Sequence, residues 1–211
     1  SLPGWPDYWY GFPPMHYATH ALSPLLAISD TTVKSVVCQG SGTIREEYAE
    51  KYNSPFAVET ALLALRNSDL SCEVTRSLFD TIRQYRESFD VYGTKLSFEW
   101  EQIAGEGPVV YSGYEDAERV EIPDYGHRLP REIAPYTIHG VYDEEHEHTS
   151  FVQGAGHGGS HPHLAHEFIR AIIEKRESYV DAERAANWTM AGICAHESAL
   201  KGGERIEIPM L

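Results

Sequence analysis

The sequence predicts an α+β domain with an open, largely antiparallel β-sheet and helices packed on one of its faces. β-branched segments separated by short turns fill much of residues 31–114. Two helical segments follow residue 160, and a short strand-like segment lies close to the end of the chain. With 211 residues, of which 42% are hydrophobic, we expect one domain over residues 1–211.

The first part of the chain, residues 1–14, is rich in proline and aromatic residues, so we expect an irregular arm. Pro13 and Pro14 predict a helix from about Met15, because proline is tolerated in a first helical turn. Pro24 is expected to end or kink this helix, because its nitrogen carries no hydrogen to donate.

Several strands are predicted in the middle of the chain. TTVKSVVCQG predicts the first, bounded by Gly40 and Gly42. FAVETALLALRNSDLSCEVTRSLF predicts a hairpin that turns at Asn67-Ser68-Asp69, although its run of Ala and Leu also suits a helix. ESFDVYG and KLSFEWEQ predict a second hairpin around Gly93, and VVYSGY a further strand. Residues 116–160 lack clean periodicity and are expected to form a long loop excursion.

The first C-terminal helix is predicted from Leu164, Phe168 and Ile172, whose four-residue spacing forms one apolar face. Ser160 is expected to cap this helix, and Pro162 lies in its first turn.

A second helix is predicted to begin after Asp181, its expected N-cap, and to stop at Gly202 and Gly203. One face of this helix carries mostly small residues suited to close packing on a sheet, namely Trp188, Gly192, Ala195 and Ala199. ERIEIP predicts a last strand. A sheet whose other face and edges stay open needs a cover, which a second subunit supplies economically.

The formal net charge of −15 argues against nucleic acid and anionic membranes as partners. It also disfavours a strongly anionic substrate unless a local basic pocket overrides it, so a neutral sugar or polyol fits better. No apolar run approaches the length of a membrane span. Cys38, Cys72 and Cys194 show no CxxC spacing, which indicates free thiols in a reducing compartment, and we expect a cytoplasmic location.

The segment PPMHYATH is the first candidate for catalysis. On a helix, His16 and His20 share one face, with Tyr17 beside them. Two imidazoles and a phenol suit proton removal from a sugar hydroxyl. The alternative is that one histidine is structural and the other faces solvent. We expect no metal, because a metalloprotease helix needs glutamate where Tyr17 stands. The acidic stretch DEEHEH, at residues 143–148, is interpreted as a solvated loop.

The segment GAGHGGSHPH is the second candidate. Its glycines at 154, 156 and 159 satisfy GxGxxG, but a dinucleotide site needs a βαβ unit, and here another helix follows. We therefore expect a substrate-binding loop rather than a nucleotide site, with a plain glycine-rich connector as the alternative. The residues expected to bind substrate are His157, Ser160, His161 and His163, together with Tyr10 of the arm.

The order of these features resembles a known family. A histidine-bearing segment, an antiparallel sheet, a glycine–histidine loop and the stretch from Gly158 to Pro209 are similar to the C-terminal domain of Gfo/Idh/MocA oxidoreductases, a fold like that of the C-terminal domain of glyceraldehyde-3-phosphate dehydrogenase. The resemblance implies an N-terminal Rossmann domain that binds NAD or NADP and supplies a catalytic lysine. Neither is present in these residues, so the chain alone is expected to bind no cofactor and to be inactive. The resemblance also implies a homodimer formed through the sheet.

In many members of that family an Asp-x-x-x-His segment supplies the histidine for proton transfer. His20 matches this histidine, whereas His16 stands where the aspartate is expected. The resemblance implies an NAD(P)-dependent oxidoreductase acting on a sugar, inositol or related polyol. The segment from Tyr17 to Pro24 is also similar to one in NAD-dependent glycosidases, and so is His157-Gly-Gly. A redox-assisted glycosidase and a non-catalytic scaffold or sensor remain the alternatives.

Overall fold

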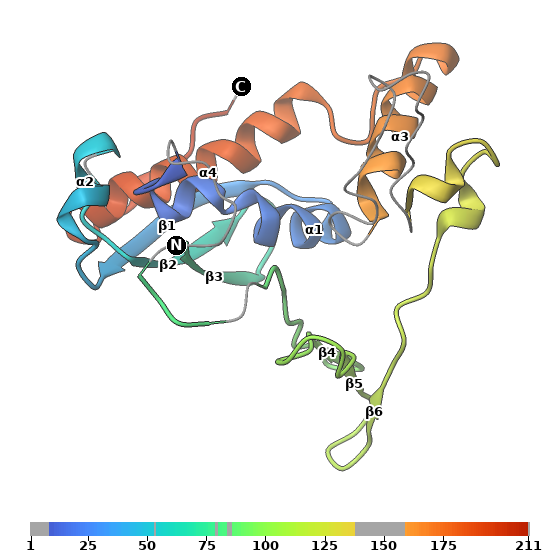
Figure 1. Ribbon diagram of the computed structural model, residues 1–211, viewed down its shortest axis with the longest axis horizontal. Helices are drawn as coiled ribbons and strands as arrows, with labels where there is room; N and C mark the ends of the chain where they lie inside the picture. Colours follow the sequence, from blue (N-terminus) through green and yellow to red (C-terminus); the bar gives the residue numbers. More distant parts are fainter. Residues whose placement is uncertain (1–8, 53, 79, 84–85, 138–158, 211) are drawn as a thin grey trace. The chain divides into compact units, whose positions relative to one another are not determined.

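The computed structural model describes residues 9–52, 54–78, 80–83, 86–137 and 159–210 (Figure 1). Contacts within the chain divide it into two compact units. The sheet unit comprises residues 1–118 and 182–211, and the small unit comprises residues 119–181. The expectation of one domain over residues 1–211 stays a prediction.

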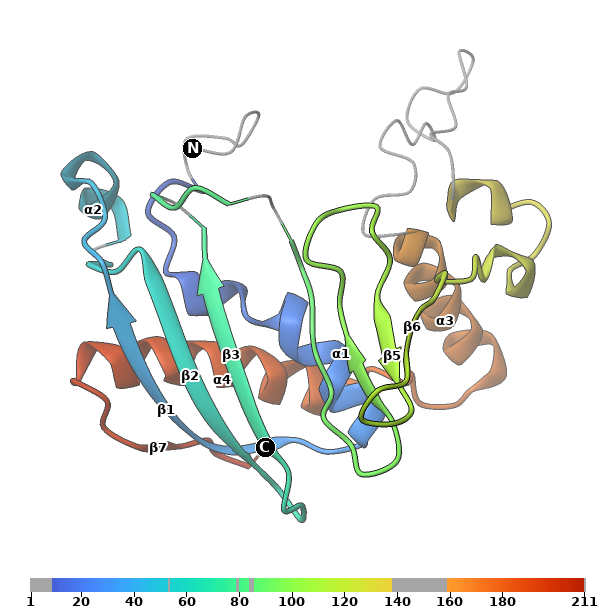
Figure 2. The ribbon, with the colours of Figure 1, turned by 90° about the horizontal axis from the view of Figure 1, so that it is seen from below.

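A four-stranded antiparallel sheet forms the centre of the sheet unit (Figure 2). Its order is β3-β2-β1-β7, from β1 (Val33–Ser41), β2 (Val58–Leu65), β3 (Ser71–Ser77) and β7 (Ile206–Glu207). The predicted first strand, the hairpin and the last strand are all confirmed. Buried and exposed residues alternate along β2 and β3, so one face of the sheet lies against the core and the other is open.

Helix α4 (Ala182–Leu200) lies across the inner face of this sheet, with α1 (Thr19–Ser29) beside it (Figures 1 and 2). Asn187 joins α4 to β1, since its side chain accepts a hydrogen bond from the Val33 N–H at 2.8 Å and donates one to the Val33 carbonyl at 3.0 Å. Ser198 accepts a further bond from the Cys38 N–H at 2.9 Å. The expected arrangement of helices on one face of the sheet is confirmed.

Small residues bring α4 close to the preceding segments, as the sequence predicts. Gly192 approaches the Met15 carbonyl so closely that an added Cβ would lie 2.1 Å from its oxygen. The helix ends where Gly202 and Gly203 adopt positive φ values of 69° and 92°. Their N–H groups donate to the carbonyls of Ala199 and Ser198, which satisfies the end of the helix.

The predicted helix from Met15 is divided into two parts. A 3-10 turn, η2 (Pro14–Tyr17), precedes α1, which continues past Pro24 to Ser29. The expectation that the helix ends at Pro24 is wrong. Proline removes one backbone hydrogen bond, but Leu22 and Leu26 are each only 1% exposed, and their packing maintains the helix on both sides of it.

A short helix that the sequence reasoning did not predict, α2 (Glu46–Tyr52), follows β1. Its Tyr48 forms a buried cluster with Ile44 and Leu78. Partly buried hydrophobic residues of the arm and η2 pack against this cluster, including Trp9, Tyr10, Phe12 and Tyr17. The described end of the arm therefore belongs to the core of the sheet unit.

A second sheet has the order β4-β5-β6, from β4 (Ser97–Glu99), β5 (Val109–Tyr111) and β6 (Ala117–Arg119). The hairpin predicted around Gly93 forms only in part. Val91 and Phe98 exchange two backbone hydrogen bonds of 2.7 and 2.8 Å, but β4 pairs along its length with β5. The strand predicted at VVYSGY is β5.

The small unit contains η3 (Gly126–Arg128), η4 (Ala134–Thr137) and α3 (Ser160–Glu174). Ser160 is not the cap of α3: the N-cap is Gly159, at φ 82°, and no side chain bonds there. An added Cβ on Gly159 would lie 2.5 Å from the Thr137 carbonyl oxygen, so the close approach requires glycine. The predicted apolar face, Leu164, Phe168 and Ile172, is exposed.

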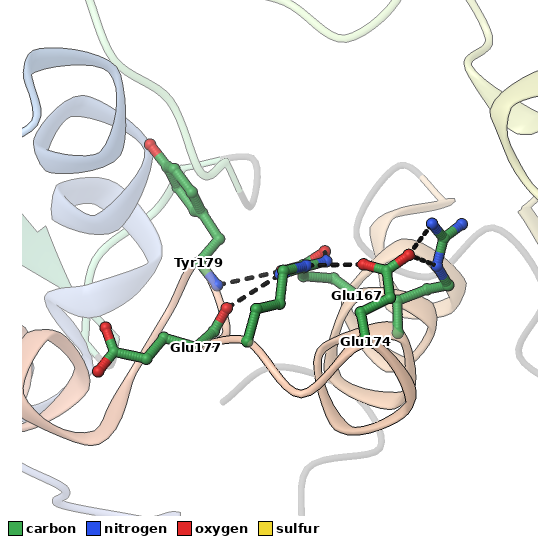
Figure 3. Close-up of polar contacts among 6 residues, drawn as sticks. Glu167, Glu174, Glu177 and Tyr179 are labelled. Atoms are coloured by element: carbon green, nitrogen blue, oxygen red, sulfur yellow. Dashed lines mark hydrogen bonds and ion pairs between the residues drawn. The ribbon is translucent and has the colours of Figure 1, made fainter.

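Ion pairs and hydrogen bonds hold the segment after α3 against that helix (Figure 3). The Arg176 guanidinium contacts Glu167 at 2.7 Å and Glu174 at 2.8 Å, and Arg170 also pairs with Glu174. The Tyr179 N–H donates to Glu167 at 3.1 Å. These contacts lower the pKa of Glu167 to about 2, chiefly through its hydrogen bonds with Arg176.

Candidate functional site

The end of η2 and the start of α1 carry the residues predicted to be catalytic, and they bring Tyr17 and His20 together. The rings of Tyr17 and His20 stack with 3.9 Å between centroids and 11° between planes. The His20 Nε2 lies 3.7 Å from a Glu87 carboxylate oxygen. A carboxylate at this distance stabilises the positive charge that His20 would gain on accepting a proton. The stack therefore holds a proton acceptor beside a phenol.

His16 has different neighbours, because η2 and α1 meet at Ala18 rather than forming one continuous helix. The His16 ring packs edge-on against His196 of α4 at 5.1 Å and against Phe12 at 5.5 Å. The single helix face expected for His16 and His20 is thus replaced by two ring clusters, on consecutive helical turns.

Glu59 of β2 lies behind η2 and is fully buried. One carboxylate oxygen lies 2.6 Å from the His196 Nδ1, and the other accepts a hydrogen bond from the Met15 N–H at 2.8 Å. A buried carboxylate is stable only when its oxygens are bonded in this way. Glu59 therefore joins β2, α4 and η2, and sets the position of the turn that carries His16.

The electrostatics of this cluster keep His16 neutral. Burial lowers the pKa of His16 from its ordinary value, and the nearby charge of His196 lowers it further, whereas Glu59 acts in the opposite direction. A neutral imidazole offers one nitrogen that accepts a hydrogen bond. His16 is therefore suited to orienting a hydroxyl group at neutral pH.

Arg76 of β3 is the cation of the same inner face and is 6% exposed. Its guanidinium carbon lies 5.3 Å from the centroid of the Tyr17 ring, a cation–π distance. Glu59 is the residue opposite Arg76 in the ladder of β2 and β3. The Tyr17 ring thus has His20 and Arg76 as neighbours.

The thiols near this region are poor nucleophiles. Burial, assisted by the charge of Glu59, raises the pKa of Cys38 to about 12. Burial likewise raises the pKa of Cys72 and of Cys194. All three stay protonated at neutral pH, which argues against covalent cysteine catalysis.

Four residues of the site were missed by reasoning from the sequence: Glu59, Arg76, Glu87 and His196. The strand pattern held a signal for two of them, because Glu59 shares the inward phase of Ala61 and Leu63, and Arg76 that of Val74. A charged residue at an inward position of an apolar strand points to a buried polar site. His196 follows Gly192 by four residues and lies on the same packed face of α4.

The predicted substrate loop belongs to the small unit, and residues 159–163 of it are among the described residues. Ser160, His161 and His163 form the first turn of α3. An open groove of about 660 Å³ adjoins this turn, lined by Ser160, His163, Leu164, Glu167, Arg176, Glu177 and Tyr179. His157, Gly154, Gly156 and residues 143–148 lie outside the described residues. Tyr10 packs against the Tyr48 ring at 5.1 Å, in the aromatic cluster of the sheet unit.

Within the described parts of the chain, no group of three His, Cys, Asp or Glu side chains is arranged to hold a metal ion. Among the helices that the structure describes, none has both the length and the apolarity needed to span a membrane.

No protein-family model and no curated protein matches the sequence. Several solved structures do match the fold. An oxidoreductase from Pseudomonas syringae superposes with a TM-score of 0.58 at 13% identity, over 92% of this chain and 52% of that chain. An inositol dehydrogenase homolog from Azotobacter vinelandii, complexed with NADH and myo-inositol, gives 0.56 at 13% identity, over 92% and 49%. An oxidoreductase from Agrobacterium radiobacter, in complex with NAD+, L-tartaric acid and magnesium, gives 0.51 at 14%, over 83% and 43%.

The chain spans about half the length of each of these solved structures. At identities this low the similarity establishes the fold and not the reaction. The predicted α+β class, with an open antiparallel sheet, is confirmed. The chain has the fold of one half of the Gfo/Idh/MocA-type oxidoreductases, the family that its C-terminal sequence resembles.

Proposed function

We propose that this chain is the substrate-binding and dimerising half of an NAD(P)-dependent oxidoreductase that acts on a sugar, inositol or related polyol. His20 is the general base, and His16 and Tyr17 orient the reacting hydroxyl. The observation that carries the proposal is the stack of Tyr17 on His20, with Glu87 at 3.7 Å, in a chain with this fold. The free, protonated thiols suit a cytoplasmic enzyme.

Oxidation of a secondary alcohol removes a hydride from carbon and a proton from oxygen. A nicotinamide bound by the other half of the protein would supply the hydride acceptor. The residues of this chain manage the proton. The Tyr17 hydroxyl holds the substrate oxygen, and His20 accepts its proton while Glu87 stabilises the resulting imidazolium. The neutral His16 ring accepts a hydrogen bond from another hydroxyl of the substrate and so orients the reacting one.

The cofactor is expected to bind outside this chain. Gly159, the described glycine of the GxGxxG pattern, opens α3, and the next helix or strand in the described chain is α4. The second strand of a dinucleotide-binding unit is therefore missing after α3 in residues 159–181. We expect calorimetry to show no NAD binding by this chain at micromolar concentrations. Binding in that range would contradict the assignment.

The open face of the main sheet is the proposed dimer interface. The helices α1 and α4 cover the other face (Figure 2). Leu62 is 61% exposed and pairs in the ladder with Val37, and Leu70 beside them is 55% exposed. A groove of about 340 Å³ runs over these strands. An open sheet face that carries exposed leucines is covered economically by a second copy of itself.

The test is oxidation by the full-length protein of a panel of sugars and inositols with NAD or NADP, followed by cofactor absorbance. We expect His20→Gln to lower kcat by about 100-fold or more, the contribution typical of a general base. His127→Gln, which replaces an exposed histidine of the small unit, is the matched control and should leave kcat unchanged. Full activity of the His20→Gln variant would show that His20 is not the general base.

The same panel distinguishes the alternatives. Release of nitrophenol from a nitrophenyl sugar with no net change in cofactor would indicate a redox-assisted glycosidase. If neither oxidation nor release occurs with any substrate, the protein is better described as a scaffold or sensor that has kept the fold.

A further inference from the structure

Arg76 is a buried cation, and its Nε–H has no hydrogen-bond acceptor among the residues that the structure describes. Its side chain is on the inner face of β3 and only 6% exposed. Removing a guanidinium from water is unfavourable unless anions or hydrogen-bond acceptors replace the water. Buried arginines therefore usually donate to a carboxylate or phosphate through two parallel N–H groups.

Among the residues that the structure describes, none accepts a hydrogen bond from Arg76 or forms an ion pair with it. Its Nε is buried and makes no hydrogen bond there. The obvious acceptor is Glu59, its neighbour across the ladder, but both oxygens of Glu59 are bonded to other groups, the His196 ring and the Met15 N–H. What Arg76 does contact is the Tyr17 ring, at 5.3 Å. A ring attracts a cation but accepts none of its directed N–H bonds.

Arg76 lies close to the residues proposed to be catalytic. Tyr17 stacks on His20, so the guanidinium lies one ring away from the proposed base. With a formal net charge of −15, the protein as a whole repels anions. A buried guanidinium whose Nε–H has no acceptor among the described residues is the local exception to that field, because attraction is stronger where water is excluded.

We propose that Arg76 receives a carboxylate group of the substrate, so that the substrate is a hydroxylated carboxylic acid, such as a uronate or an aldonate, rather than a neutral polyol. This inference rests on the proposed function, since it specifies the substrate of the same site. One guanidinium neutralises the single charge of a carboxylate, whereas a phosphate monoester carries more than one negative charge at pH 7. The carboxylate fixes the position of the substrate, and His20 acts on a hydroxyl of the same molecule.

The first experiment measures binding to this chain by NMR, using the Nε–H signal of Arg76, assigned by its loss in Arg76→Lys. The probes are D-glucuronate and D-gluconate, with D-glucose and D-glucitol as their neutral counterparts. We expect the two acids to shift the signal saturably and the neutral compounds to leave it in place. Equal shifts with acids and neutral compounds, or none with either acid, would overturn the proposal. A larger, saturable shift with glucose 6-phosphate would replace carboxylate by phosphate and also overturn it.

A variant pair controls for simple loss of positive charge. Arg76→Gln should weaken binding of the acids by about 10- to 100-fold, the loss of a charge-assisted hydrogen bond. Arg205→Gln removes the same charge from an exposed residue that pairs with Glu207, and should leave binding unchanged. Arg76→Lys keeps the charge without the planar fork and should recover only part of the affinity. Equal weakening by Arg76→Gln and Arg205→Gln would show that the loss of binding comes from the change in net charge and not from a site at Arg76.

The second experiment uses the full-length enzyme and separates this inference from the proposed function. Arg76→Gln should raise KM at least about 10-fold more for the acid than for the neutral counterpart, because both substrates lose the Arg76 contact with Tyr17 but only the acid loses a partner of its own. Equal losses for both substrates would make Arg76 structural while the oxidoreductase remains. Absence of any oxidation, with the Arg76 signal still shifted by acids, would remove the proposed function and leave the carboxylate site.

Discussion

The Nδ1 atom of His196 lies 2.6 Å from a carboxylate oxygen of Glu59, a residue with no exposure to solvent. The second oxygen of Glu59 accepts the Met15 N–H at 2.8 Å. One buried carboxylate thus joins three elements that are far apart in the sequence. Because an unpaired charge or donor in a protein interior is strongly unfavourable, the cluster is expected to stabilise the fold and to define the geometry of η2.

Glu59→Ala should lower the free energy of unfolding of this chain by about 3–5 kcal/mol, because it leaves His196 and the Met15 N–H without their buried acceptor. Glu59→Gln, which retains an acceptor oxygen of similar shape, should lose less. Urea denaturation measures both. Glu207→Ala, at an exposed surface pair, is the control and should change stability by less than about 1 kcal/mol. Equal effects of Glu59→Ala and Glu207→Ala would disprove the role of the cluster.

His16 should make the stability of the protein depend on pH. Burial lowers its pKa in the folded state below that of the unfolded chain. The unfolded state therefore binds more protons as the pH falls below about 6.5, and folding is weakened there. In His16→Gln this contribution is absent, so the stability difference between wild type and variant should shrink as the pH falls from 7.5 to 5.

Urea denaturation at a series of pH values checks this, with a maximum slope of about 1.4 kcal/mol per pH unit. His127→Gln is the control. Its ring is exposed, so the curves of this variant and of the wild type should run parallel. A constant difference between wild type and His16→Gln over the whole range would contradict the prediction.

Gly192→Ala should destabilise the protein although alanine favours helix. The new Cβ would lie 2.1 Å from the backbone oxygen of Met15, which cannot move aside as a flexible side chain does. The clash displaces η2 from α4 and should lower the free energy of unfolding by about 1–3 kcal/mol. Thr189→Ala, at an exposed position of the same helix, provides the comparison in thermal unfolding. A Gly192→Ala variant more stable than the wild type would contradict this, because it would show that η2 moves to accommodate the new Cβ without a loss of stability.

Arg176→Gln should raise the pKa of Glu167 from about 2 back toward 4.5, because the arginine supplies the main hydrogen bonds that hold it down. Since the folded-state pKa is depressed, the stabilisation of the small unit by this pair is present above the unfolded value and is lost as the pH falls toward 2. A carbon-detected NMR titration of the glutamate side chains measures the shift. Lys175→Gln removes a positive charge next to Arg176 in the sequence and should leave the pKa of Glu167 unchanged.

Leu62→Glu should convert the proposed dimer into a monomer, because it places a charge in the middle of the open sheet face. Light scattering at high protein concentration reports the mass directly. Ile28→Glu changes an equally exposed apolar residue of α1 and should leave the dimer intact. A monomeric wild type, or a Leu62→Glu variant that remains dimeric, would place the interface elsewhere or remove it.

Local patterns were sufficient for most of the sheet unit. The β-branched residues between Gly40 and the preceding helix predicted β1, and the Val/Thr pattern with the turn at Asn67-Ser68-Asp69 predicted the hairpin of β2 and β3. The small residues of α4 predicted its close packing, and Gly202 with Gly203 its end. These features depend on backbone preferences and periodicity, which neighbouring residues encode.

Other features were decided by partners far away in the sequence. The fold class, the strands of the main sheet and the choice of His16, Tyr17 and His20 as candidates follow from the sequence alone. The continuation of α1 past Pro24, the pairing of β4 with β5 and the separation of His16 from His20 depend on tertiary packing. The bonds of Glu59 do so as well, and so does the Arg76 Nε–H, which has no acceptor among the described residues. A buried charge is satisfied by whichever groups the fold brings within hydrogen-bonding distance.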